Sequence, residues 1–216
     1  KYYDKIKEYG FTKPIGFQIK GEGKPKIPHP EDKEWNGLSL PWMAFGYGVS
    51  MTPLQTLTFY NAVANNGEMV KPSFIRSIGA FGEEPVYKID REVIMHSICS
   101  KKTLKSVQIM LKNVVEKPWG TANNIYDKNI SIAGKTGTSQ IDYTSDETQY
   151  VSSFVGYFPA DNPKYSAIVV INKPNKSKGF YGNSVAAPVF KKVAQKIITG
   201  IPIEIEISKK DIGILF

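Results

Sequence analysis

Two apolar, β-rich runs joined by a short loop constrain the fold of this 216-residue chain more than any other feature. The runs cover residues 152–158 and 165–171, and the loop between them, 159–163, reads Pro-Ala-Asp-Asn-Pro. Such runs around a Pro/Asp/Asn loop predict an antiparallel hairpin. Residues 184–199 then place apolar side chains at helical spacing before Gly200, which predicts an amphipathic helix lying on the sheet.

The segment upstream of this hairpin, residues 133–139, reads Ala-Gly-Lys-Thr-Gly-Thr-Ser. A lysine, two hydroxyls and two glycines within six residues suit the binding of a carboxylate, and we expect the segment to be a third strand of the sheet. Two other interpretations stay open. Gly-Lys-Thr at 134–136 also ends a phosphate loop, although Asn129 stands where that loop needs glycine and no helix is predicted next. The segment also fits a polar, glycine-bounded turn between strands.

The rest of the chain predicts three helices, a small hairpin and a long surface loop from apolar spacing, caps and Gly/Pro signals. These elements are a helix over 1–9 stopped at Gly10, a loop over 21–35, a helix starting at Thr52-Pro53 and ending at Asn65-Asn66-Gly67, a hairpin of 71–78 and 85–89, and a helix capped by Ser100 that runs to Lys117-Pro118.

The composition, with 41% hydrophobic residues, fits one well-buried domain. The net charge is +8, but the lysines are scattered and no nucleic-acid motif occurs, so we expect a solvated basic surface and no nucleic-acid partner. The chain has two histidines, His29 and His96, and a single cysteine, Cys99. We therefore expect no metal site, no cofactor and no internal disulfide. No apolar run approaches a membrane span.

Five stretches carry a family resemblance, in the family's order and across nearly the whole chain: 45–55, 65–72, 133–139, 154–159 and 181–190. They resemble the C-terminal half of a penicillin-binding protein transpeptidase domain, most closely the class B, monofunctional type of the septal, division-associated enzymes. The resemblance implies an α+β fold in which helices cover an antiparallel sheet that is incomplete at its N-terminal side. It also implies that residues 1–216 form the C-terminal part of one transpeptidase domain.

The function that this resemblance implies is peptidoglycan D,D-transpeptidation. Such an enzyme cross-links stem peptides that end in D-alanyl-D-alanine through a serine acyl-enzyme, and it binds β-lactams. The family's Lys-Thr-Gly element falls on Lys135, Thr136 and Gly137. The lysine would draw in the substrate carboxylate and support proton transfer, and the hydroxyls of Thr136 and Thr138 would hold it across the open face left by Gly137.

Further site residues follow from the same resemblance. The backbone N–H of Thr138 is similar to the family's second oxyanion donor. Phe180 and Tyr181 are similar to an aromatic wall beside the site, although both also fit a packing anchor for their loop. Ser139 extends the strand and is a candidate for lining the pocket.

The chain departs from the family at the nucleophile. Neither Ser-x-x-Lys nor Ser-x-Asn occurs in residues 1–216. Ser100 gives only Ser-x-x-Thr, and Tyr-Gly-Asn at 181–183 imitates a Tyr-x-Asn variant but lies after Lys-Thr-Gly. In the family both missing elements precede residues 45–55. We therefore expect a fragment that begins after the second element and is inactive by itself.

The resemblance also implies a place in the cell and partners. We expect the extracytoplasmic face of the cell membrane, an N-terminal anchor outside this chain, and division proteins as partners. Three alternatives stay open: a D,D-carboxypeptidase, a penicillin-sensing domain of the same fold, and a non-catalytic carboxylate-binding module. A Ser-x-x-Lys segment encoded upstream would distinguish an enzyme from such a module.

Overall fold

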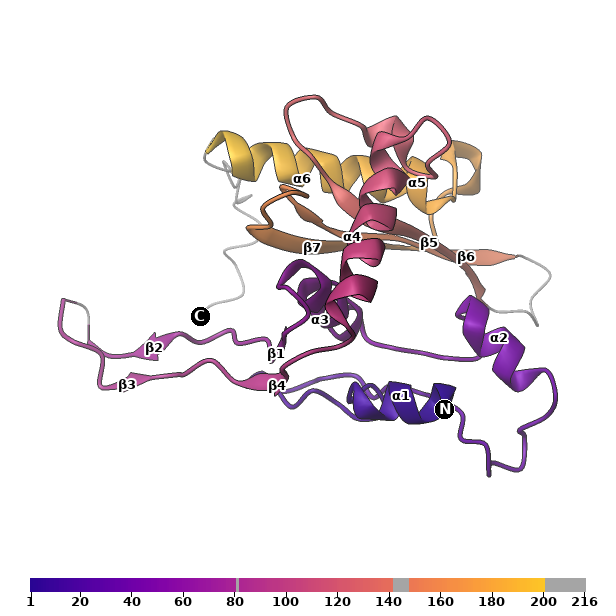
Figure 1. The fold of residues 1–216 in the computed structure, drawn as a ribbon, viewed down its shortest axis with the longest axis horizontal. Helices are drawn as coiled ribbons and strands as arrows, with labels where there is room; N and C mark the ends of the chain where they lie inside the picture. The colour runs from indigo at the N-terminus through magenta and orange to yellow at the C-terminus, as the bar shows by residue number, and fades with distance from the viewer. Residues whose placement is uncertain (81, 142–147, 201–216) are drawn as a thin grey trace, which may run out of the picture.

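The computed structural model describes residues 1–80, 82–141 and 148–200. Its centre is a three-stranded antiparallel sheet in the order β5-β6-β7, with helices on both faces (Figure 1). The elements are α1 (Tyr2–Glu8), α2 (Ser39–Phe45), α3 (Pro53–Ala64), β1 (Met69–Val70), β2 (Ser77–Ile78), β3 (Tyr87–Lys88), β4 (Val93–Met95), α4 (Lys101–Glu116), the 3₁₀ helix η1 (Asn123–Ile125), β5 (Ala133–Ile141), β6 (Gln149–Phe158), β7 (Tyr165–Asn172), the 3₁₀ helix η2 (Lys176–Lys178), α5 (Gly182–Val185) and α6 (Ala187–Thr199).

The predicted α+β class and the predicted hairpin are confirmed. Strands β6 and β7 pair antiparallel with Phe154 opposite Val169. The Lys-Thr-Gly segment is strand β5, and Thr136 lies opposite Phe154 of β6. Because the chain continues as a strand after Thr136, the phosphate-loop and turn interpretations are both wrong.

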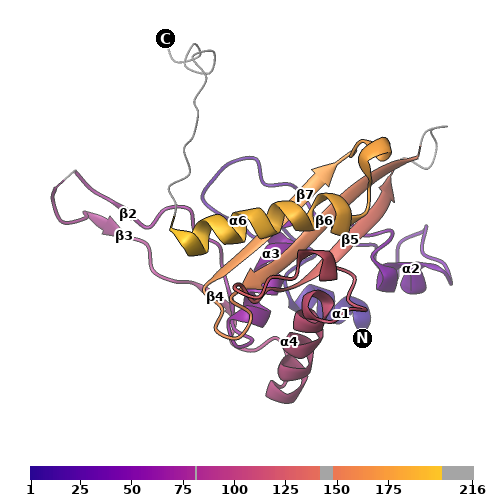
Figure 2. The same cartoon turned by 90° about the horizontal axis from the view of Figure 1, so that it is seen from above.

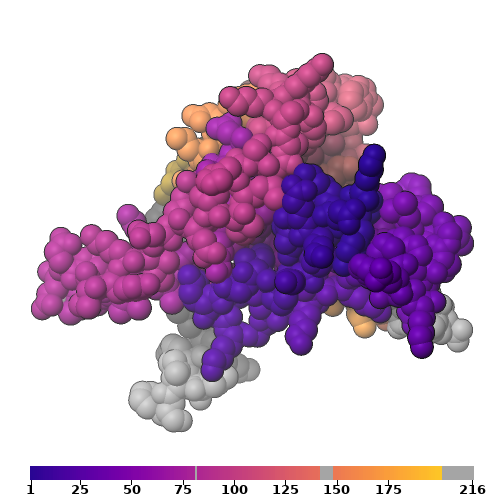
Figure 3. Space-filling view, turned by 60° about the horizontal axis from the view of Figure 1, so that its bottom comes forward, coloured from indigo at the N-terminus to yellow at the C-terminus, as the bar shows by residue number. Residues whose placement is uncertain are grey.

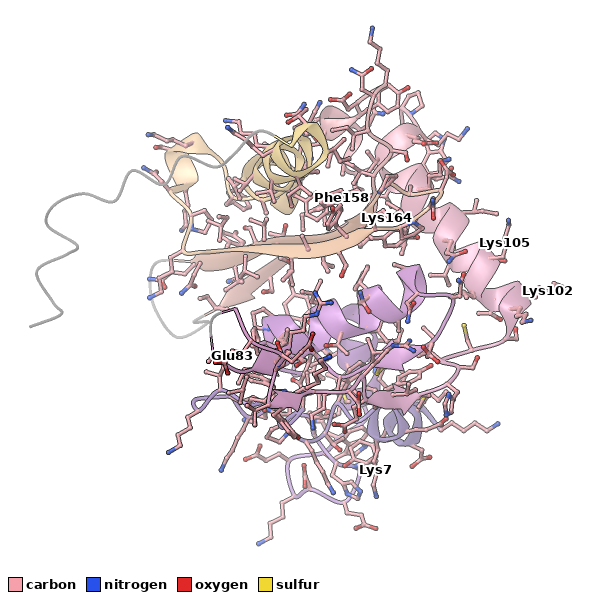
Figure 4. All side chains as sticks on the ribbon, turned by 90° about the vertical axis from the view of Figure 1, so that its left-hand side faces the viewer. Lys7, Glu83, Lys102, Lys105, Phe158 and Lys164 are labelled. Carbon is pink, nitrogen blue, oxygen red and sulfur yellow. The ribbon has the colours of Figure 1, made fainter. Side chains whose placement is uncertain are left out.

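One face of the sheet packs against α6, which lies across the strands (Figure 2). Phe154 and Phe158 of β6 meet Phe190 of α6 edge-on, with ring centroids 4.8 and 5.6 Å apart. All three side chains are fully buried. Figure 4 shows Phe158 between the sheet and α6, whereas Lys102 and Lys105 point away from the body. Burial of each of these rings stabilises the fold by roughly 1.5–3 kcal/mol, so this contact fixes α6 on the sheet.

The opposite face of the sheet is covered by α3 and the edge of α4. Tyr157 and Ala133 are buried there with Val63 of α3 and Leu104 and Leu111 of α4. The N-terminal residues close this cluster from outside, where Figure 3 shows them in indigo against the magenta segment that leads into α4. The predicted helix of residues 1–9 is confirmed as α1.

Both predicted helix caps are confirmed. The Thr52 hydroxyl oxygen accepts a hydrogen bond from the Gln55 backbone N–H, and the Gln55 side-chain oxygen accepts one from the Thr52 backbone N–H, which forms a capping box before Pro53. Ser100 accepts from the Thr103 N–H at 3.2 Å. Each cap satisfies backbone donors that the first turn of a helix leaves unpaired.

The structure corrects the bounds of two predicted elements, the C-terminal helix and the small hairpin. The single helix predicted over residues 184–199 is two helices, α5 and α6, divided at Ala186. Pro188 lies in the first turn of α6. The backbone N–H groups of a first turn have no partner within the helix, so a proline, which lacks this N–H, is tolerated at the start of a helix but not in its interior. The small hairpin is confirmed, but only Ser77–Ile78 and Tyr87–Lys88 pair in it.

No helix within the described residues is long and apolar enough to cross a membrane.

The Tyr157 hydroxyl provides a test of the buried face. Among the described residues it has no hydrogen-bond partner, and burial raises the pKa of Tyr157 to about 12. We expect Tyr157→Phe to leave the free energy of unfolding unchanged or to raise it, because an unpaired buried hydroxyl costs about 1–3 kcal/mol. Urea unfolding measures the change.

Tyr9→Phe is the matched control, because the Tyr9 hydroxyl donates to the Ile98 carbonyl at 2.9 Å. We expect this variant to lose about 1 kcal/mol. A loss at Tyr157→Phe as large as the loss at Tyr9→Phe would mean that the Tyr157 hydroxyl is hydrogen-bonded in solution.

Candidate functional site

The candidate site lies along β5, where hydroxyls line a shallow cavity of about 340 Å³. Thr136 and Thr138 are two positions apart on the strand, so their side chains share one face, the face of Phe154 and α6. The complete lining consists of Thr121, Thr136, Thr138, Tyr181, Gly182 and Asn183.

Each threonine hydroxyl of β5 has a neighbour that fixes its direction. The Thr138 Oγ1 accepts a hydrogen bond of 2.9 Å from the Gly182 backbone N–H. Because that bond occupies an oxygen lone pair, the Thr138 hydroxyl proton is free to point into the cavity. The Thr136 Oγ1 lies 3.2 Å from the Thr121 Oγ1, so these two hydroxyls share a hydrogen bond.

Lys135 starts on the other face of β5, opposite Val155. Its ammonium nitrogen Nζ nevertheless donates to the Thr136 carbonyl at 3.1 Å and to the Thr136 Oγ1 at 3.3 Å. The lysine therefore brings its positive charge next to the hydroxyl pair and remains exposed to solvent. A cation beside two hydroxyl donors forms a site for a carboxylate.

An aromatic stack borders the cavity. The Phe180 ring lies on the Tyr150 ring, with centroids 4.2 Å apart and planes at 18°, and its centroid is 4.4 Å from that of Tyr181. The Ser152 hydroxyl donates to the Phe180 carbonyl and ties the loop to β6. Phe180 thus packs behind the cavity, whereas Tyr181 lines it and is 59% exposed.

Gly182 holds the loop against the strands by close backbone approach. A Cβ atom at this position would stand 2.4 Å from the Ser153 carbonyl oxygen and 2.5 Å from the Gly137 carbonyl oxygen. Only glycine fits that distance, so Gly182 allows its segment to approach the backbone of β5 and β6.

The structure brings together most of the residues predicted from the sequence. Thr136, Thr138 and Tyr181 line the cavity, and Lys135 reaches it around the strand. Ser139 lies on the opposite face of β5 from the threonines and does not line the cavity.

Sequence reasoning missed four residues of this region: Thr121, Tyr150, Gly182 and Asn183. Thr121 stands 14 positions before Lys135 in no recognisable motif, and Tyr150 is one aromatic residue among twelve tyrosines. Only tertiary contacts identify them. Asn183 was mentioned in the sequence analysis only because Tyr-Gly-Asn at 181–183 imitates the Tyr-x-Asn variant of a missing element. The structure shows that Asn183 lines this cavity.

Comparisons with known proteins agree with this arrangement. The family described as "Penicillin binding protein transpeptidase domain" matches residues 1–195. The peptidoglycan D,D-transpeptidase FtsI of Buchnera aphidicola subsp. Baizongia pistaciae is 34% identical over 172 residues, which are 77% of this chain and 28% of that protein. Stage V sporulation protein D of Bacillus subtilis is 30% identical, over 88% of this chain and 29% of its own length.

Solved structures show the same fold. Penicillin binding protein 3 of Mycobacterium tuberculosis, complexed with ampicillin, superposes with a TM-score of 0.73 at 29% identity, covering 93% of this chain and 46% of that one. Penicillin-binding protein 2B of Streptococcus pneumoniae gives a TM-score of 0.73 at 22% identity, over 91% of this chain and 32% of its own.

The chain belongs to the penicillin-binding protein transpeptidase domain family. It spans about 28% to 29% of the length of the two curated relatives named above. The resemblance drawn from the five sequence stretches is therefore confirmed at the level of the family and its fold.

The close approach of Gly182 predicts a specific sensitivity. We expect Gly182→Ala to destabilise the chain by about 1–3 kcal/mol, because the new methyl group must push α5 away from β5 and weaken the bond to Thr138. Thermal unfolding measures the loss. Gly37→Ala is the control, since a Cβ at Gly37 meets no atom within 4 Å. Equal stability of the two variants would contradict the close packing.

Proposed function

We propose that this chain supplies the carboxylate-binding wall of a serine D,D-transpeptidase that acts on peptidoglycan stem peptides ending in D-alanyl-D-alanine. One observation carries the proposal: two hydroxyls share the open face of β5, and the Lys135 ammonium nitrogen lies 3.3 Å from one of them. The relatives named peptidoglycan D,D-transpeptidase support the reaction class. In this proposal residues 1–216 are the C-terminal part of one transpeptidase domain.

Each residue of the wall has a chemical task. Thr136 and Thr138 donate their hydroxyl protons to the terminal carboxylate of the stem peptide. Lys135 attracts that anion and supports the proton transfers of acylation. The backbone N–H of Thr138 donates to the oxygen that becomes negative in the tetrahedral intermediate, where loss of one such donor typically costs about 3 kcal/mol.

The aromatic residues complete the wall. Tyr181 covers the substrate at the rim, and Phe180 supports Tyr181 through its stack on Tyr150. Ser139 lies on the other face of β5 and takes no part in this wall.

The same site accounts for β-lactam binding, because these antibiotics also carry a carboxylate beside a reactive carbonyl. A solved relative complexed with ampicillin supports this part of the proposal. We place the parent enzyme at the extracytoplasmic face of the cell membrane, held by an anchor outside residues 1–216, with division proteins as partners. The family resemblance to septal enzymes supports that placement.

The first test of the proposed function concerns the nucleophile. The 216 residues contain no Ser-x-x-Lys, so we expect this chain alone to form no covalent adduct with benzylpenicillin. Intact-mass spectrometry after incubation is the measurement. A mass increase equal to one antibiotic molecule would contradict the proposed division of roles, because another nucleophile would then be present.

The second test of the proposed function concerns the binding of the substrate carboxylate. In a polypeptide that carries this chain together with a Ser-x-x-Lys segment, we expect Thr136→Val to lower acylation by a thioester substrate about ten- to hundredfold. A hydrogen bond to a charged group contributes roughly 1.5–3 kcal/mol, and about 1.4 kcal/mol is a tenfold change in rate. The methyl ester of the same substrate lacks the anion, so its acylation should barely change.

Thr136→Ser is the matched control, since it keeps a hydroxyl at that position. Thr136 suits the test better than Thr138, whose Oγ1 also accepts from Gly182 and therefore contributes to packing. Equal losses on the acid and the ester would mean that Thr136 acts as a strand residue and not as a carboxylate donor.

A further inference from the structure

Asn183 lines the cavity of the candidate site together with Thr136 and Thr138. Its main chain is held on both sides. The Asn183 carbonyl accepts a hydrogen bond of 2.8 Å from the Asn124 Nδ2, and the preceding Gly182 N–H donates to Thr138. The backbone of residue 183 is thus fixed beside the threonine hydroxyls.

The usual structural reasons for an asparagine do not apply to Asn183. It does not cap a helix, because the N-cap of α5 is Tyr181 and that cap has no side-chain hydrogen bond. Its φ is not positive, since Asn66 and Lys173 are the non-glycine residues of positive φ within the described residues. Within the same residues its side-chain amide makes no hydrogen bond to the protein, although the residue is half-buried.

The cavity offers a carboxylate fewer donors than that ligand can use. An ionised carboxylate accepts about four hydrogen bonds. Thr138 provides one hydroxyl proton, and the pair Thr121 and Thr136 provides one more, because one of their two protons bridges them. Lys135 has one N–H left after its two bonds to Thr136, which makes three donors. The lining has two further neutral side-chain donors, the Tyr181 hydroxyl and the Asn183 amide with its two N–H groups; Tyr181 is 59% exposed, whereas Asn183 is half-buried beside the threonines.

We propose that Asn183 is a substrate-binding, specificity-determining residue, whose side-chain amide donates a hydrogen bond to the terminal carboxylate of the ligand beside Thr136 and Thr138. This inference rests on the proposed function, because it concerns the same carboxylate. It assigns the Tyr-Gly-Asn sequence at 181–183 to the carboxylate end of the site, where the exposed Tyr181 and the half-buried Asn183 both line the cavity.

The test is a titration of the 216-residue chain with N-acetyl-D-alanyl-D-alanine and with its methyl ester, followed by NMR. We expect the Nδ2–H₂ resonances of Asn183 to shift with the acid and to stay in place with the ester. Asn183→Ala should weaken binding of the acid about tenfold, the effect of losing one hydrogen bond to a charged group. A residue that only packs would not produce this difference between acid and ester.

Asn183→Asp is the second variant, because it keeps the shape of the side chain while replacing the donor by a negative charge. We expect it to weaken binding of the acid about a hundredfold, by loss of the donor and by like-charge repulsion. Asn129→Asp is its matched control: it makes the same change of charge at an exposed residue outside the cavity, and it should leave binding unchanged.

Thr136→Val, titrated in parallel, separates the two proposals. If Thr136→Val weakens binding of the acid and both Asn183 variants bind like the unaltered chain, the inference about Asn183 is wrong and the proposed function stands. Equal weakening for acid and ester at Asn183 also overturns the inference, since it indicates a structural role. If the unaltered chain binds the acid no better than the ester, the proposed carboxylate site itself fails.

Discussion

The antiparallel register between β5 and β6 decides which face of the sheet receives each side chain of the Lys-Thr-Gly strand. Because Thr136 pairs with Phe154, the threonines share a face with the aromatic contact that holds α6. A register shift by one residue would turn both hydroxyls to the α3 side and bring Lys135 to the α6 side. The buried rings of β6 make that shift costly, so the hydrophobic core and the polar site specify the same register.

Much of this arrangement is predictable from the sequence, because it depends on local signals. The strands around residues 154 and 168 are apolar and bounded by a turn, and the caps at Thr52 and Ser100 are short-range hydrogen bonds. The pairing of Met69–Val70 with Val93–Met95 was not predicted, since those strands are two and three residues long and far apart in sequence. Helix α2 carries an internal proline and exposed apolar residues, so its pattern does not resemble that of an amphipathic helix.

The site was only partly predictable for a related reason. Successive side chains of a strand point to opposite faces of the sheet. The placement of Thr136 and Thr138 on one face was therefore predictable from their spacing of two residues. The cavity residues outside β5 come from segments that are distant in sequence and pack against β5 in the fold. Thr121 arrives from the loop after α4, and Asn183 from the short helix α5. Neither approach has a local signature, because each depends on close packing such as that of Gly182 against Gly137.

That packing ties ligand binding to stability at some positions and leaves it separate at others. Thr138 uses one oxygen both to hold the Gly182 N–H and to present a proton to the cavity, so removing its hydroxyl loosens α5 and removes a donor together. Thr136 and Asn183 face the same cavity without holding a backbone group through their side chains. Under the proposed function, changes at these two residues report on ligand binding, whereas changes at Thr138 and Gly182 affect ligand binding and the position of α5 at once.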